Sequence, residues 1–130
     1  MLILDATTQS ITVTTTLAKN IDYLASWSDH TTTTLTPGKS KGSITTAATT
    51  TIVAAPAAST QRQIHYISLV NKDTSYQTLT VHHDTSGTKT TISPNNVVLQ
   101  AGESIVFSKD GFNVLTVDGA IKTVSTVKDG

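Results

Sequence analysis

The stretch that decides the fold is Ile11-Thr12-Val13-Thr14-Thr15-Thr16-Leu17. Its apolar side chains recur at alternate positions with threonine between them, and an extended strand places alternate residues on one face. Threonine suits such a strand because its branched Cβ is stiff, while its hydroxyl keeps the outer face wettable. The stretch therefore predicts a β-strand with one face buried in a core.

Threonine is abundant along the whole chain. It supplies 27 of the 130 residues, often in runs such as 31–34 and 49–51, whereas cysteine is absent and apolar residues make up only 37%. This composition favours a thin sandwich over a thick multilayer core. A chain of this length is expected to form one domain, and the lack of cysteine excludes disulfides and thiolate metal sites.

Further strands are predicted on the C-terminal side of this stretch. Residues 21–28 alternate in the same way, and we expect them to form a hairpin with residues 11–17 through a turn at 18–20. Residues 63–70 are apolar at positions of both parities, which is typical of a central strand covered on both faces. Residues 76–83 alternate again and predict another strand with one buried face.

Short strands separated by tight turns continue through the last third of the chain. Asp110-Gly111 and Asp118-Gly119 each separate apolar alternations, and Asp-Gly is a strong turn signal because glycine adopts a positive φ at little cost. With about eight or nine short strands, we predict an all-β chain that forms an antiparallel β-sandwich or jelly roll, with a small barrel as the remaining option. No segment predicts a helix.

One polar segment breaks the alternation. Residues 29–42 contain four consecutive threonines followed by proline and two glycines, and we interpret them as a long exposed loop or arm. The predicted organisation is a single β domain over residues 1–130, with N-terminal strands and the extended arm in 1–43 and the sandwich core in 44–130. Such an arm could add a strand to the sheet edge of a partner. The residues expected to contact that partner are Thr31, Thr32, Thr33, Thr34, Pro37, Lys39 and Lys41.

The charge pattern argues against several classes of partner. Nine Lys and Arg residues balance nine Asp and Glu residues, so the formal net charge is zero, and no nucleic-acid partner is expected without clustered cations. No apolar run reaches the roughly 18 residues of a membrane span, and the first residues lack the regions of a signal peptide. We expect synthesis in the cytoplasm, no membrane association, and self-association, because little charge keeps copies apart.

Groups with chemical potential are few. The histidines are His30, His65, His82 and His83. His82 and His83 point to opposite faces of one strand and cannot readily share a metal, and His65 either pairs across strands with one of them or is an ordinary surface side chain. We therefore predict no metal ligand, no cofactor-binding residue and no catalytic residue.

Two further groups have competing interpretations. His83 and Asp84 are adjacent and could form a catalytic dyad. An Asp at the end of a strand, however, more often caps the next turn with its side chain. Tyr23 and Trp27 could form a platform for sugar stacking, yet both lie on the apolar face of their predicted strand. We therefore favour the core or a subunit interface for these two rings.

Several stretches resemble a known family. Residues 53–64, VAAPAASTQRQI, contain a Pro-Ala-Ala-Ser-Thr-x-Arg turn, and the strand that follows ends in Asn71-Lys72-Asp73. The later stretches are LQAGESI at 99–105, DGFNVL at 110–115 and DGAIK at 118–122. In this order they are similar to the middle and the end of small virion structural proteins of tailed bacteriophages, over roughly residues 44–122.

The resemblance implies a non-enzymatic β-sandwich protein that is present in many copies and bound to other virion proteins. Within that class we expect a capsid decoration or cement protein on the capsid surface, made in the host cytoplasm. It would bind the major capsid protein as a dimer or trimer and stabilise the shell.

Two alternatives remain open. One is a tail, baseplate or fibre-associated module that binds a receptor or a glycan. The other, from a different class, is a small hydrolase or lectin-like accessory domain, which would require turnover that depends on His83 or Asp84.

Overall fold

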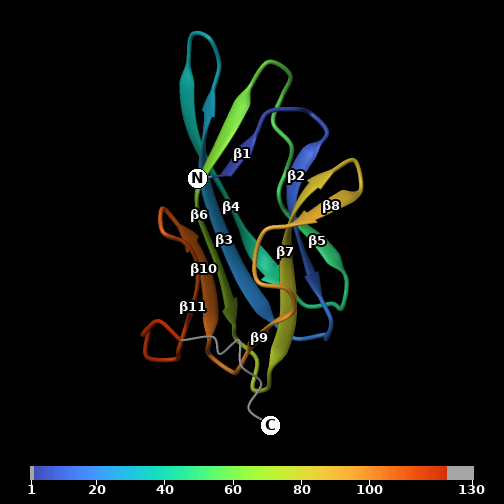
Figure 1. Cartoon of the computed structure of the whole chain (residues 1–130), viewed down its shortest axis with the longest axis vertical. Coiled ribbons are helices and arrows are strands. Elements are labelled where there is room, and N and C mark those ends of the chain that lie inside the picture. Colours follow the sequence, from blue (N-terminus) through green and yellow to red (C-terminus); the bar gives the residue numbers. More distant parts are fainter. Residues whose placement is uncertain (1, 123–130) are drawn as a thin grey trace.

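The computed structural model describes residues 2–122, which form eleven β-strands and no helix. The strands make two antiparallel sheets packed face to face, so the prediction of an all-β sandwich is confirmed (Figure 1). No helix in the described part of the chain is long and apolar enough to cross a membrane.

The first sheet has six strands, with β6 at its centre. Its order is β11 (Gly111–Leu115), β10 (Ser104–Ser108), β6 (Gln61–Asn71), β3 (Ile21–His30) and β4 (Leu35–Ile44), and β1 (Leu2–Leu4) also pairs with β6. β3 lies along one side of β6, and β1 and β10 share the other side, at residues 62–64 and 67–70 respectively. β4 is therefore an edge strand of this sheet.

The second sheet has five strands, and β7 is its longest. The order is β5 (Thr49–Val53), β2 (Gln9–Thr15), β7 (Gln77–Thr85) and β8 (Thr88–Thr91), with β9 (Val97–Leu99) paired to the other end of β7. In Figure 1 this sheet faces the first one along the length of the molecule.

The core consists of inward-facing aliphatic side chains from both sheets. In β6, Ile64, Ile67 and Leu69 have no exposed surface, whereas Tyr66 and Val70 on the other face are only half-buried. The prediction that this strand is central is confirmed, but the prediction that both of its faces are covered is wrong. The outer face of β6 carries apolar side chains that no further layer covers. Sequence periodicity cannot distinguish such a face from one that is buried in a second core.

The predicted hairpin between residues 11–17 and 21–28 does not form. β2 and β3 belong to different sheets, and the chain between them crosses from one sheet to the other. The buried side chain of Gln77 in β7 fastens this crossing, because its Oε1 accepts from Leu17 N at 3.0 Å and its Nε2 donates to Leu17 O at 2.7 Å. Alternation alone predicts a strand and not the strand it pairs with.

The interpretation of residues 29–42 as a loop is wrong for most of the segment. Only the tip at 31–34 lies outside strands, and β4 pairs with β3 along its whole length. Glycine is unusual in a strand, but Gly38 lies opposite Trp27, and a Cβ on Gly38 would lie 2.7 Å from Trp27 Nε1. The aromatic ring fills the space of the missing side chain.

The N-terminal strands form part of both sheets. β2 pairs with β5 and β7, and β3 pairs with β6, so residues 1–43 contribute strands throughout the sandwich. The turn predictions hold at Asp110-Gly111 and Asp118-Gly119, where the two glycines have φ of 87° and 85°.

We predict that Gly38→Val lowers the free energy of unfolding by about 1–3 kcal/mol, because the new side chain overlaps the Trp27 ring. Lys39→Val is the matched control, since Lys39 is the exposed neighbour in the same strand. Urea unfolding followed by far-ultraviolet circular dichroism measures both variants. Equal stability of the two variants would contradict the packing of Trp27 on Gly38.

Candidate functional site at the hairpin end

The β3–β4 hairpin extends past one end of the sandwich, at the top of Figure 1, close to the loop between β5 and β6. We call this region, residues 28–34 and 58–65, the hairpin end. All residues from Thr31 to Pro37 are exposed. The hairpin end therefore presents side chains to solvent from two neighbouring segments.

The tip of the hairpin is ordered by its own threonines. Thr31 Oγ1 lies 2.7 Å from Thr34 Oγ1 and accepts from Thr34 N at 3.0 Å, and Thr31 N donates to Thr34 O at 3.0 Å. Hydroxyl bonds to the local backbone are the usual way in which threonine organises a turn. The four threonines predicted as part of an arm thus make a defined tip.

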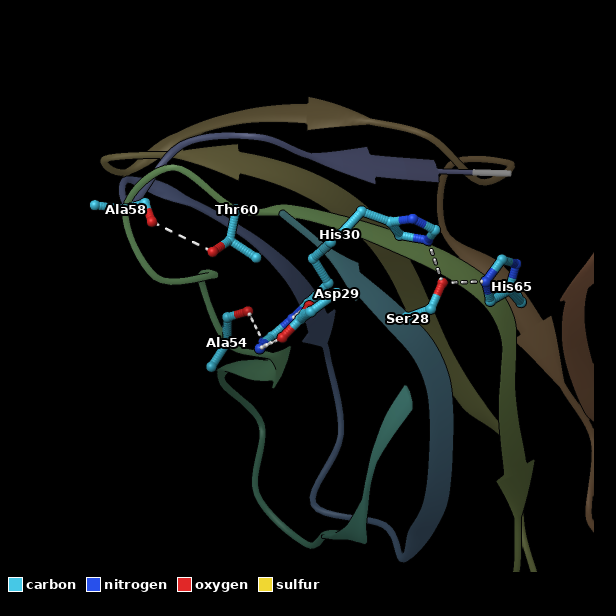
Figure 2. Close-up of polar contacts among 8 residues, drawn as sticks. Ser28, Asp29, His30, Ala54, Ala58, Thr60 and His65 are labelled. Carbon is cyan, nitrogen blue, oxygen red and sulfur yellow. Dashed lines mark hydrogen bonds and ion pairs between the residues drawn. The ribbon is translucent and has the colours of Figure 1, made fainter. Parts of the chain in front are cut away.

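A shallow open hollow lies beside the tip. Its volume is about 320 Å³, and its lining consists of Asp5, His30, Thr31, Thr32, Ser59, Thr60 and Gln61. Every one of these side chains can form hydrogen bonds, and none is Phe, Tyr or Trp. Thr60 Oγ1 donates to the carbonyl of Ala58 at 3.3 Å within the β5–β6 loop (Figure 2).

Arg62 joins the hairpin to the body of the sandwich. Its Nε and Nη2 donate to the two carboxylate oxygens of Asp29 at 2.8 and 3.0 Å, and its Nη1 donates to Ala54 O at 2.8 Å. Its guanidinium also lies 4.5 Å from the centre of the Trp27 ring. Bidentate pairing and stacking use the planar fork of arginine, which lysine lacks.

On the outer face of the same sheet, one hydroxyl lies between two histidines. Ser28 Oγ is 2.8 Å from His30 Nε2 and 2.8 Å from His65 Nε2 (Figure 2). His30 shares the face of Ser28 because it is two residues further along β3. His65 reaches this face because the β3–β6 register shifts there, from Ser26 opposite Tyr66 to Trp27 opposite Ile64. A β-bulge of this kind re-aims a side chain.

This group lacks the geometry of a catalytic triad. A nucleophilic serine needs a base that is itself oriented by a third group, usually a carboxylate. Within residues 2–122, neither histidine bonds to a carboxylate, and Asp29 beside them is turned to Arg62. The same part of the chain contains no group of three or more His, Cys, Asp or Glu side chains placed to hold a metal ion.

The residues predicted for the arm lie in two places. Thr31 and Thr32 line the hollow, with Thr33 and Thr34 beside them at the tip. Pro37, Lys39 and Lys41 lie further down β4. A second hollow, of about 450 Å³, is lined by Asp22, Tyr23, Leu24, Lys41, Gly42 and Ser43.

The other histidines lie away from the hairpin end. His82 Nε2 is 3.1 Å from Thr14 Oγ1, and burial followed by the nearby charge of Lys89 lowers the pKa of His82. His83 Nε2 is 3.1 Å from Ile3 O. The option that His65 pairs with one of them is wrong, because they belong to the second sheet.

Two further sequence interpretations are settled by the structure. Asp84 Oδ1 accepts from Gly87 N at 2.8 Å, so its predicted role as a turn cap is confirmed. Tyr23 and Trp27 are half-buried and packed against the core. Ser28, His30, His65 and Arg62 were not predicted as a group, because only the bulge and the strand pairing bring them together.

Comparisons with protein-family models, with curated proteins and with solved structures found no match to this chain.

We predict that Arg62→Ala lowers the free energy of unfolding by about 1–3 kcal/mol, because a half-buried carboxylate and a carbonyl lose their donors. The matched control is Lys72→Ala, which removes an ion pair with Asp22 whose side chains are 50% and 42% exposed. That loss is expected to stay below about 1 kcal/mol. Chemical unfolding of both variants measures the difference, and similar losses would show that Arg62 is no more than a surface charge.

Proposed function

We propose that the protein is a non-enzymatic structural protein of a bacteriophage virion, most specifically a capsid decoration or cement protein that attaches to the head surface through its hairpin end. The proposal rests on the resemblance of residues 53–64 and 99–122 to such proteins and on the geometry of that end. Its partner is the major capsid protein, and copies associate as dimers or trimers on the shell.

The observation that carries the proposal is an exposed hairpin that hydrogen bonds and an ion pair tie to itself and to the sandwich. The tip has its own hydrogen bonds, and Arg62 ties the hairpin to Trp27, Asp29 and Ala54. A binding element that is already ordered loses less conformational entropy on association than a flexible arm does. Repeated attachment on a lattice would add up contacts that are individually weak.

The attachment is expected to use the tip and not the free edge of β4. That edge carries Pro37, Lys39 and Lys41, and proline and lysine are residues that protect sheet edges from added strands. The tip at residues 31–34 carries neither proline nor lysine, so its exposed threonines are free to contact a partner. Leu35, which is 62% exposed at the start of β4, supplies an apolar contact beside the threonines.

A second candidate function is a tail, baseplate or fibre-associated module that binds a glycan or receptor. The hollow at the hairpin end favours it, because all of its lining side chains can bond to sugar hydroxyls. The lining has no Phe, Tyr or Trp ring for a sugar to stack on, and for this reason we rank the candidate second.

The test is binding of the purified protein to empty capsids from which it has been stripped, imaged by cryo-electron microscopy. The decoration proposal predicts density that repeats over the head lattice, with the hairpin end against the shell. Density confined to one vertex or to the tail would support the second candidate, and a glycan-binding screen would follow. Absence of any bound density would contradict the decoration proposal and favour the second candidate, which the glycan-binding screen then tests.

A tip variant tests the attachment surface. Thr32→Glu with Thr33→Glu places two charges on the exposed tip and is expected to weaken capsid binding by at least about tenfold through desolvation of unpaired charge. Thr88→Glu with Thr90→Glu is the matched control, because these threonines are exposed on β8 in the other sheet. Equal binding by both variants would place the contact elsewhere.

A further inference from the structure

The hairpin end holds two imidazoles that point at one position. His30 Nε2 and His65 Nε2 each lie 2.8 Å from Ser28 Oγ, so the two nitrogens are no more than twice that distance apart. Figure 2 shows both rings directed at the serine hydroxyl, His30 from above and His65 from the side. Each ring therefore presents its Nε2 to the same point on the outer face of the sheet.

The hydroxyl satisfies both rings only with a particular arrangement of protons. A serine hydroxyl has one proton to donate, so one Nε2 accepts it and the other must carry a proton and donate to Oγ. The rings thus need different tautomers. A positive ion held between the two Nε2 atoms, with the Ser28 hydroxyl displaced from its present position, would allow both rings to hold the same tautomer, with each Nε2 lone pair directed at the ion.

The backbone supports this convergence. The bulge at His65 turns its side chain to the outer face. Without the bulge, His65 would share the inward face of Ile67, two residues away. Bulges concentrate next to functional sites because they re-aim one side chain at a fixed place. His65 is exposed and His30 is half-buried beside the open hollow, so solvent ions reach both rings.

The cations near the two rings are Lys39, which is exposed and lies opposite Ser26 on the same face, and Arg62. Arg62, the nearest cation on β6, is paired with Asp29 in a bidentate ion pair. Asp5 lines the same hollow as His30 and supplies a carboxylate on that side. The neighbourhood therefore combines two imidazoles with one exposed carboxylate and one exposed ammonium group.

From this geometry we propose that His30 and His65 form a two-histidine site for a divalent transition metal, in which the remaining coordination positions are open to water or to a donor from a docked molecule. Imidazole nitrogen is a ligand for Cu²⁺, Ni²⁺ and Zn²⁺ and a poor one for Mg²⁺. Two nitrogens at about 2.0–2.1 Å from one zinc lie a little over 3 Å apart, so metal binding requires the two rings to adjust to that separation. The site does not depend on the proposed attachment to a capsid.

Because the metal has only two protein ligands, affinity should follow the intrinsic order of the ions. Cu²⁺ is expected to bind more tightly than Ni²⁺ or Zn²⁺. Trp27, the single tryptophan of the chain, precedes Ser28 and provides a reporter, since bound Cu²⁺ quenches indole fluorescence at short range.

The experiment is a titration of the untagged full chain with Cu²⁺, Zn²⁺ and Mg²⁺ alone, followed by Trp27 fluorescence for Cu²⁺ and by calorimetry for all three ions. We expect saturable binding of one Cu²⁺, weaker binding of Zn²⁺ and none of Mg²⁺. His30→Gln and His65→Gln should each weaken Cu²⁺ binding by at least about tenfold, since one of two ligands is lost. His82→Gln, in the other sheet, is the matched control and should bind as the unchanged chain does.

The histidine ring signals of the unchanged chain provide a measurement that needs no variant. In a proton nuclear magnetic resonance titration with substoichiometric Cu²⁺, the signals of His30 and His65 should broaden before those of His82 and His83. The proposal is overturned if the unchanged chain binds no Cu²⁺, if His30→Gln and His65→Gln bind it as tightly as His82→Gln does, or if all four rings broaden together.

Discussion

The pairing of β3 with β6, interrupted once at His65, is the constraint on which the rest of the structure depends. On one side of the bulge, Ile67 and Leu69 point into the core, and on the other side Ile64 does so. A shift of one residue reverses the faces of a strand. The bulge therefore keeps aliphatic side chains inside along the whole of β6 and leaves His65 outside.

The same constraint builds the hairpin end. Because Ile64 faces inward, Arg62 two residues earlier lies on the inner side at the rim of the sandwich, within reach of Asp29 and Trp27. The ring of Trp27 in turn covers Gly38 and holds the edge strand β4. One change of register thus connects the core to the exposed tip, and both the attachment and the metal site that we propose depend on the order it creates.

The sequence was informative about strands and turns, and less so about their partners. Alternation in residues 11–17 and the Asp-Gly pairs predicted an all-β sandwich with the right turns, because these signals are local. The prediction of a hairpin between 11–17 and 21–28 was wrong because strand pairing depends on contacts distant in sequence. Here these contacts are the hydrogen bonds between the Gln77 side chain and the Leu17 backbone. The prediction of a loop at 29–42 was wrong because glycine and proline are usually depleted in strands. Here aromatic rings fill the space over the glycines, and local composition does not reveal such packing. The group of Ser28, His30 and His65 depends on a β-bulge that the residue pattern does not predict.

Amide hydrogen exchange in the native state, compared between the unchanged chain and Arg62→Ala, tests most directly whether the hairpin end is ordered by its tie to the sandwich. The account predicts that protection falls in residues 27–30 and 35–38, near the tip, while residues 21–25 and 41–44 of the same two strands keep theirs. Protection that is unchanged near the tip, or lost equally along β3 and β4, would contradict it.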